Sequence, residues 1–96
     1  MTDTRERIKL FDEMRAILTR AQEERPHRQG FVDGELDWVL FERATMLAAV
    51  NQARAEHGLL PVPMESIARA EQQAVGHSDY FKKFALYCAE LVQEQQ

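Results

Sequence analysis

The feature that most constrains the fold is the spacing of apolar residues near the end of the chain. They recur every three or four residues: Phe81, Phe84, Ala85, Cys88, Leu91 and Val92. This repeat places side chains on one face of an α-helix. Ser78 and Asp79 just before the run are residue types that cap helix N-termini. The pattern therefore predicts a helix over residues 79–94 with one face buried in a core.

The same repeat, combined with helix-ending residues, predicts three more helices. Pro26 prevents the first from continuing, Gly58 offers a left-handed residue after the second, and Pro63 suits the first turn of the third. The predicted helices span residues 3–25, 34–57 and 63–75. β-branched residues nowhere alternate over the length of a strand. We therefore expect an all-α, compact bundle of about four helices, forming a single domain over residues 1–96.

Composition and charge limit the cellular compartment and the class of partner that we expect. The chain has 96 residues, a formal charge of −4 and one cysteine, Cys88. One cysteine excludes an intramolecular disulfide framework and favours a reducing compartment. The first residues are not followed by the apolar stretch of a signal peptide, and no apolar run is long enough to cross a membrane. We therefore expect a cytoplasmic protein without a membrane partner.

Nucleic acid is also an unexpected partner, although residues 63–94 have roughly the proportions of a helix-turn-helix motif. Lys82 falls where that motif usually turns an apolar side chain inward, and neither half of the chain carries a strong excess of basic residues. The negative charge comes from residues 29–96. The sequence therefore predicts no nucleic-acid binding.

Two charges stand within otherwise apolar helix faces. The residues three and four positions from Arg43 and from Glu71 are all apolar. A buried charge needs a partner, so we hypothesise that Arg43 and Glu71 meet between the second and third helices as a desolvated pair. The alternative is that each long side chain reaches water with its tip. A pair would fix helix register rather than catalyse a reaction.

The turn before the last helix gathers several reactive groups. His77, Ser78, Asp79 and Tyr80 follow Gly76 at a helix start, where free backbone N–H groups can hold an anion. Gly, Ser and Asp are also what a helix junction needs, so capping is the first interpretation and a ligand site the second. His77 and Asp79 are two residues apart, which does not match a metal-binding face of a helix, and no His-x-x-x-His pattern occurs, so we predict no metal and no cofactor. Cys88 is expected to be a core residue, and no catalytic residue is predicted.

One segment resembles part of a known family. Residues 46–62 contain Asn51, a spaced Arg54 and the turn Gly58-Leu-Leu-Pro61. They are similar to the opening helix of the CAP, or cysteine-rich secretory protein, superfamily, an α-β-α sandwich. The resemblance covers less than a fifth of the chain, and another helix is predicted after it, where that family has further strands and a second His and Glu. We infer neither secretion nor a CAP-type cavity from it.

Surplus apolar surface suggests what the domain does. The first helix offers Phe11, Met14 and Leu18 at heptad-like spacing for docking on a partner or second subunit, and Leu86 and Tyr87 lie outside the apolar face of the last helix. We therefore expect a non-catalytic protein–protein interaction module, a homodimer. The alternative is a small-ligand-binding domain with a pocket between the second, third and fourth helices. Its candidate lining residues are Trp38, Arg43, Glu71, His77, Asp79 and Tyr80.

Overall fold

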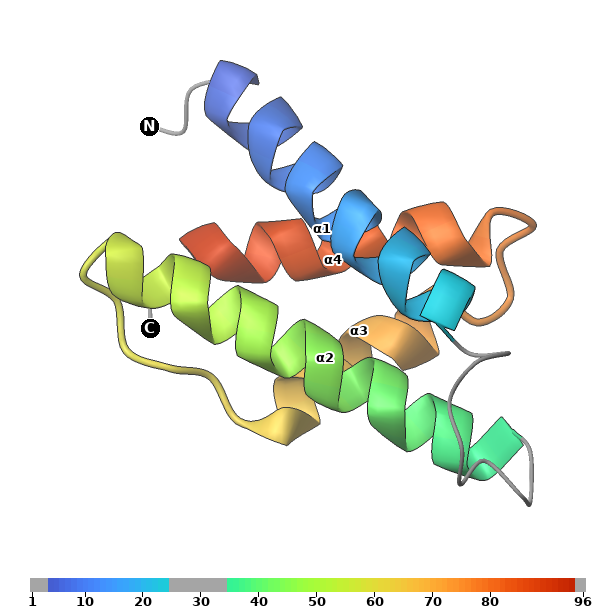
Figure 1. Cartoon of the computed structure of the whole chain (residues 1–96). Coiled ribbons are helices and arrows are strands. Elements are labelled where there is room, and N and C mark those ends of the chain that lie inside the picture. The colour runs from blue at the N-terminus through green and yellow to red at the C-terminus, as the bar shows by residue number, and fades with distance from the viewer. Residues whose placement is uncertain (1–3, 25–34, 95–96) are drawn as a thin grey trace.

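The protein is a bundle of four α-helices over the residues that its structure, a computed structural model, describes, namely 4–24 and 35–94 (Figure 1). The helices are α1 (Thr4–Glu24), α2 (Glu35–Glu56), α3 (Met64–Ala74) and α4 (Tyr80–Gln93). The all-α prediction is confirmed, and each helix end lies one residue inside its predicted boundary. The predicted N-terminal caps of α1 and α2, Asp3 and Asp33, fall outside the described residues.

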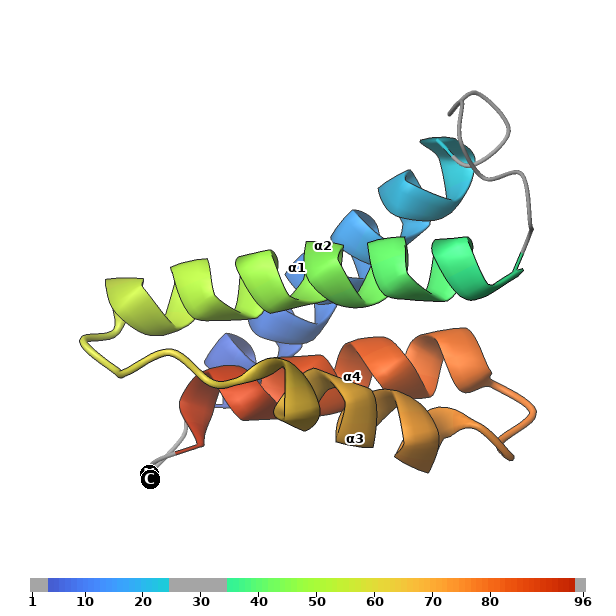
Figure 2. The same ribbon diagram turned by 90° about the horizontal axis from the view of Figure 1, so that it is seen from below.

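The helices pack in two levels around a shared core. Figure 2 shows α2 lying over α3 and α4, while α1 crosses the bundle at an oblique angle. Helix α4 contacts all three other helices, and α2 does the same for α1, α3 and α4. None of the described helices is long and apolar enough to pass through a lipid bilayer.

The core is built from one face of each helix. Helix α4 buries Phe84, Ala85, Cys88 and Val92 completely, as its apolar spacing predicted, while Phe81 and Leu91 are partly buried at its edge. The other helices add residues that recur at three or four positions: Leu10, Met14 and Leu18 from α1, Met46 and Val50 from α2, and Ile67, Ala70 and Ala74 from α3. Every helix therefore contributes to one hydrophobic core.

The ends of the helices are set by local chemistry. Gly58 has φ +72° after α2, and the amide of Leu59 donates to the carbonyl of Arg54 at 2.8 Å, which closes the helix end. Gly76 has φ +124° after α3. Asp79 occupies the N-cap of α4, but its side chain makes no capping hydrogen bond. The carbonyl of Asp79 accepts the first hydrogen bond of the helix from the amide of Lys83, but the predicted side-chain cap is not formed by Asp79.

Candidate functional site: a buried polar cluster

Arg43 of α2 and Glu71 of α3 form an ion pair. Nε of Arg43 donates to Oε1 of Glu71 at 2.8 Å, and its Nη2 donates to the same oxygen at 2.5 Å. The side chain of Glu71 is only 6% exposed and that of Arg43 is 25% exposed. The alternative to the pairing hypothesis required that the carboxylate reach water with its tip, and Glu71 does not do so.

Tyr80 of α4 joins this pair to a second carboxylate. Its hydroxyl lies 3.0 Å from Oε1 of Glu42 and 3.3 Å from Oε2 of Glu71, and its single proton serves one of them at a time. Burial, and then the two carboxylates, raise the pKa of Tyr80 far above its usual range, so the phenol stays a donor. We call Glu42, Arg43, Glu71 and Tyr80 the polar cluster.

The polar cluster places charged groups where three helices meet. Glu42 is buried because it precedes Met46 and Val50 by one and two helical turns, so it occupies a core position of α2. Sequence reasoning identified Arg43 and missed Glu42, although that spacing to Met46 and Val50 was the available signal. Because its members come from α2, α3 and α4, the cluster fixes how these helices align along their lengths.

Two other residues proposed for a ligand pocket, His77 and Asp79, do not join the polar cluster. His77 and Asp79 are exposed, and no hydrogen bond described for the chain links either side chain to the cluster. The side chain of Trp38 lies outside the described residues. Arg43, Glu71 and Tyr80 bond directly to one another. Of the five candidates whose side chains are described, the structure therefore brings together three in a packed network.

Cys88 lies in the core near the polar cluster. It is completely buried, and burial, followed by the charges of Glu42 and Glu71, raises the pKa of its thiol to about 12. The thiol is thus protonated at neutral pH and poorly nucleophilic. Among the described residues, no group of three or more His, Cys, Asp or Glu side chains is arranged to hold a metal ion.

A second buried polar side chain, Arg54 of α2, forms hydrogen bonds that hold the opposite end of the bundle together. Arg54 is 1% exposed, and its guanidinium donates to the carbonyls of Leu60 (2.6 Å), Leu91 (2.6 Å) and Glu94 (2.7 Å). Asn51 exchanges two hydrogen bonds with the backbone of Val62, at 2.8 and 3.0 Å. Asn51 and Arg54 are the residues that carry the CAP resemblance, and here they tie the end of α2 to the following turn and to α4.

The residues predicted for a partner interface have different surroundings. Met14 and Leu18 are 1% and 0% exposed in the core, where α1 packs on α4 and α2, so these two predictions are corrected. Phe11 packs against the same core and is partly buried. Leu86 and Tyr87 of α4 are half-buried. The heptad-like spacing of α1 thus reports a contact within the chain.

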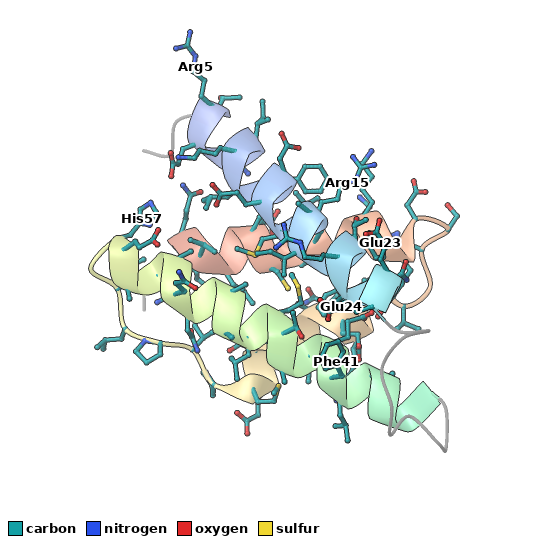
Figure 3. All side chains as sticks on the ribbon, in the orientation of Figure 1. Arg5, Arg15, Glu23, Glu24, Phe41 and His57 are labelled. Atoms are coloured by element: carbon teal, nitrogen blue, oxygen red, sulfur yellow. The ribbon has the colours of Figure 1, made fainter. Side chains whose placement is uncertain are left out.

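Uncharged surface remains on α2 instead. Every exposed position from Val39 to Ala55 is uncharged, and these residues form one stripe along the helix: Leu40, Ala44, Ala48, Gln52 and Ala55. Most exposed residues of α1 are charged by contrast, although Ile8 is 56% exposed among them, and the labelled residues Arg5 and Arg15 extend outward in Figure 3. We call the five residues the α2 stripe.

Comparison of the chain with family models, with curated proteins and with solved structures finds no match. What the protein does is therefore inferred from its own contacts and surfaces.

Proposed function

We propose that the protein is a small helical protein–protein interaction module that forms a homodimer through the α2 stripe. The supporting observation is that no exposed side chain between Val39 and Ala55 carries a charge, over about four helical turns. Leu40, the one large apolar side chain of the stripe, is 53% exposed. A long uncharged face of this kind is typical of an interaction surface, whereas the solvent-facing side of a surface helix usually carries charged residues.

The polar residues that border the α2 stripe support this proposal. Arg43 is bonded to Glu71, the hydroxyl of Thr45 donates to the carbonyl of Phe41 at 2.9 Å, and the amide of Asn51 is bonded to Val62. Their hydrogen-bonding groups have partners within the chain. A partner that covers the stripe would therefore leave all three groups hydrogen-bonded. Burying polar groups that lack hydrogen bonds is the main cost of covering a polar border.

The order of large and small side chains along the stripe favours a second copy of the chain as the partner. Leu40, Ala44 and Ala48 lie one helical turn apart. If two copies of α2 pair antiparallel about a two-fold axis at Ala44, each Leu40 lies over the partner's Ala48, and the two Ala44 positions face each other. Large then meets small on both sides of the axis, as an isologous interface requires. Alanine also allows close approach of the helices.

Sedimentation over a concentration series tests the proposal. We expect a reversible dimer for the natural chain. Ala44→Glu would place two carboxylates against each other at the axis and should raise the dimer dissociation constant at least about 100-fold. Ala16→Glu, on the exposed face of α1, adds the same charge elsewhere and should leave that constant unchanged.

Two outcomes would contradict the proposal. One is a monomer at every concentration, which would favour the small-ligand-binding domain, and the other is an equal effect of both glutamates.

The proposal includes a cytoplasmic location, because the single cysteine is a free, buried thiol that suits a reducing compartment.

A further inference from the structure

A groove of about 270 Å³ runs between α3 and α4. Its floor is formed by Ala70, Tyr87 and Leu91, and its rims carry Arg69 from α3, Glu90 from α4 and Glu94, the residue that follows α4. We propose that this groove binds a small zwitterion with one carboxylate and one ammonium group, of the size of an amino acid or dipeptide. None of the six residues belongs to α2, so this site is independent of the proposed dimer.

A small residue, Ala70, lines the groove where α3 and α4 meet. Ala70 is buried at 4% exposure, and the larger residues Tyr87 and Leu91, which line the same groove, are half-buried. The floor is thus aromatic and aliphatic. Ligand pockets are commonly about 300 to 1,000 Å³, so the groove, at about 270 Å³, is slightly smaller than usual and suits a small molecule.

The two rims have opposite charges. Arg69 is exposed on one side and Glu90 and Glu94 on the other, and in the described part of the chain none of the three makes an ion pair. A guanidinium presents paired donors that match a carboxylate, and a glutamate accepts from an ammonium group. A zwitterion lying across the groove would satisfy both rims, whereas a simple anion or cation would satisfy one.

The α4 side of the groove is held in place from beneath. The buried guanidinium of Arg54 binds the carbonyls of Leu91 and Glu94, two residues that line the groove. These contacts fix the C-terminal end of α4 and Glu94, the residue that follows it. A ligand would therefore meet a backbone that is already ordered, which lowers the entropic cost of binding.

Titration by NMR, with backbone amide signals as the readout, tests this site. The probes are L-phenylalanine, N-acetyl-L-phenylalanine, which lacks the ammonium group, and L-phenylalaninamide, which lacks the carboxylate. We expect L-phenylalanine to shift the amides of Ala70, Tyr87 and Leu91 and to bind at least about tenfold more tightly than either derivative. No shift at millimolar concentration, or equal affinity for all three probes, would overturn the proposal.

Variants assign the two charges separately. Arg69→Gln should abolish the preference for L-phenylalanine over the amide, and Glu90→Gln together with Glu94→Gln should abolish the preference over the N-acetyl derivative. Arg15→Gln and Glu23→Gln remove exposed charges from α1 and should change neither preference. A preference that survives Arg69→Gln contradicts the assignment. The Ala44→Glu variant should bind L-phenylalanine normally, which separates this result from that of the dimer.

Discussion

Two nitrogens of Arg43 converge on one oxygen of Glu71, which leaves the second oxygen of Glu71 within reach of Tyr80. The ion pair is therefore the centre of a network that spans α2, α3 and α4. A network of buried hydrogen bonds is satisfied in one alignment of the helices only, because a shift by one turn would separate donors from acceptors. We interpret the polar cluster as the device that selects this alignment.

Removal of Arg43 should expose the cost of the remaining buried charge. Arg43→Met leaves Glu71 without its cation, and we expect a loss of about 2 kcal/mol in the free energy of unfolding. That is less than for a fully buried pair, because Arg43 is a quarter exposed. In Arg43→Met/Glu71→Leu, part of this loss should be recovered, with a coupling of about 1 kcal/mol or more. Urea denaturation measures both values, and additive effects would contradict a direct pair.

Arg54 should matter more than any exposed arginine. Arg54→Met leaves the carbonyls of Leu60, Leu91 and Glu94 without their donor, so we expect a loss of about 3 kcal/mol. Arg20→Met, at an exposed position of α1, should change stability by less than about 0.5 kcal/mol. Urea denaturation of both variants checks this difference, and similar losses would contradict the role given to Arg54.

His57 should make stability depend on pH. Its Nδ1 lies 2.8 Å from the carbonyl oxygen of Ala53, and its Nε2 lies 3.2 Å from Oε1 of Glu6. Both of these oxygens are acceptors, so His57 donates to both only when each ring nitrogen carries a proton. The bond to Ala53, and then that to Glu6, raise the pKa of His57 above its ordinary 6.5.

A raised pKa in the folded state means that folding favours the protonated ring. The contribution of His57 is complete below about pH 6.5 and is lost as the pH rises through the higher pKa of the folded state. Thermal melting across this range should show the loss in the natural chain and a smaller one in Glu6→Gln. An identical pH profile for His57→Gln and the natural chain would rule out this contribution.

Cys88 should resist alkylation while the protein is folded. Its thiol is completely buried and its pKa is raised to about 12, so little thiolate forms at pH 8. We expect iodoacetamide to label Cys88 only after denaturant unfolds the chain, with mass spectrometry as the readout. Rapid labelling of the native protein at the rate of a free thiol would show that α4 does not bury this residue.

The helices were predictable because their signals are local. Gly58 and Pro63 act on the residues beside them, so the boundaries of α2 and α3 follow from the sequence to within one residue. The pairing of Arg43 with Glu71 was also predictable, since each charge is surrounded by apolar residues at helical spacing.

The rest depends on how the helices meet. The acceptors of Arg54 are backbone carbonyls, which every residue has, so no sequence pattern identifies them. Periodicity showed that Met14 and Leu18 lie on a buried face, but it does not distinguish a neighbouring helix of the same chain from a partner. Likewise, α2 is apolar around most of its circumference, and only the packing shows which face stays uncovered.

Cysteine cross-linking along the α2 stripe tests the central claim most directly. In the proposed antiparallel dimer, the two copies of residue 44 meet at the two-fold axis, whereas the two copies of residue 55 lie at opposite ends of the interface. Mild oxidation should therefore convert Ala44→Cys to a disulfide-linked dimer of twice the 11.1 kDa chain mass and leave Ala55→Cys monomeric on a non-reducing gel. Absence of the linked dimer in Ala44→Cys, or equal linkage in both variants, would contradict the account.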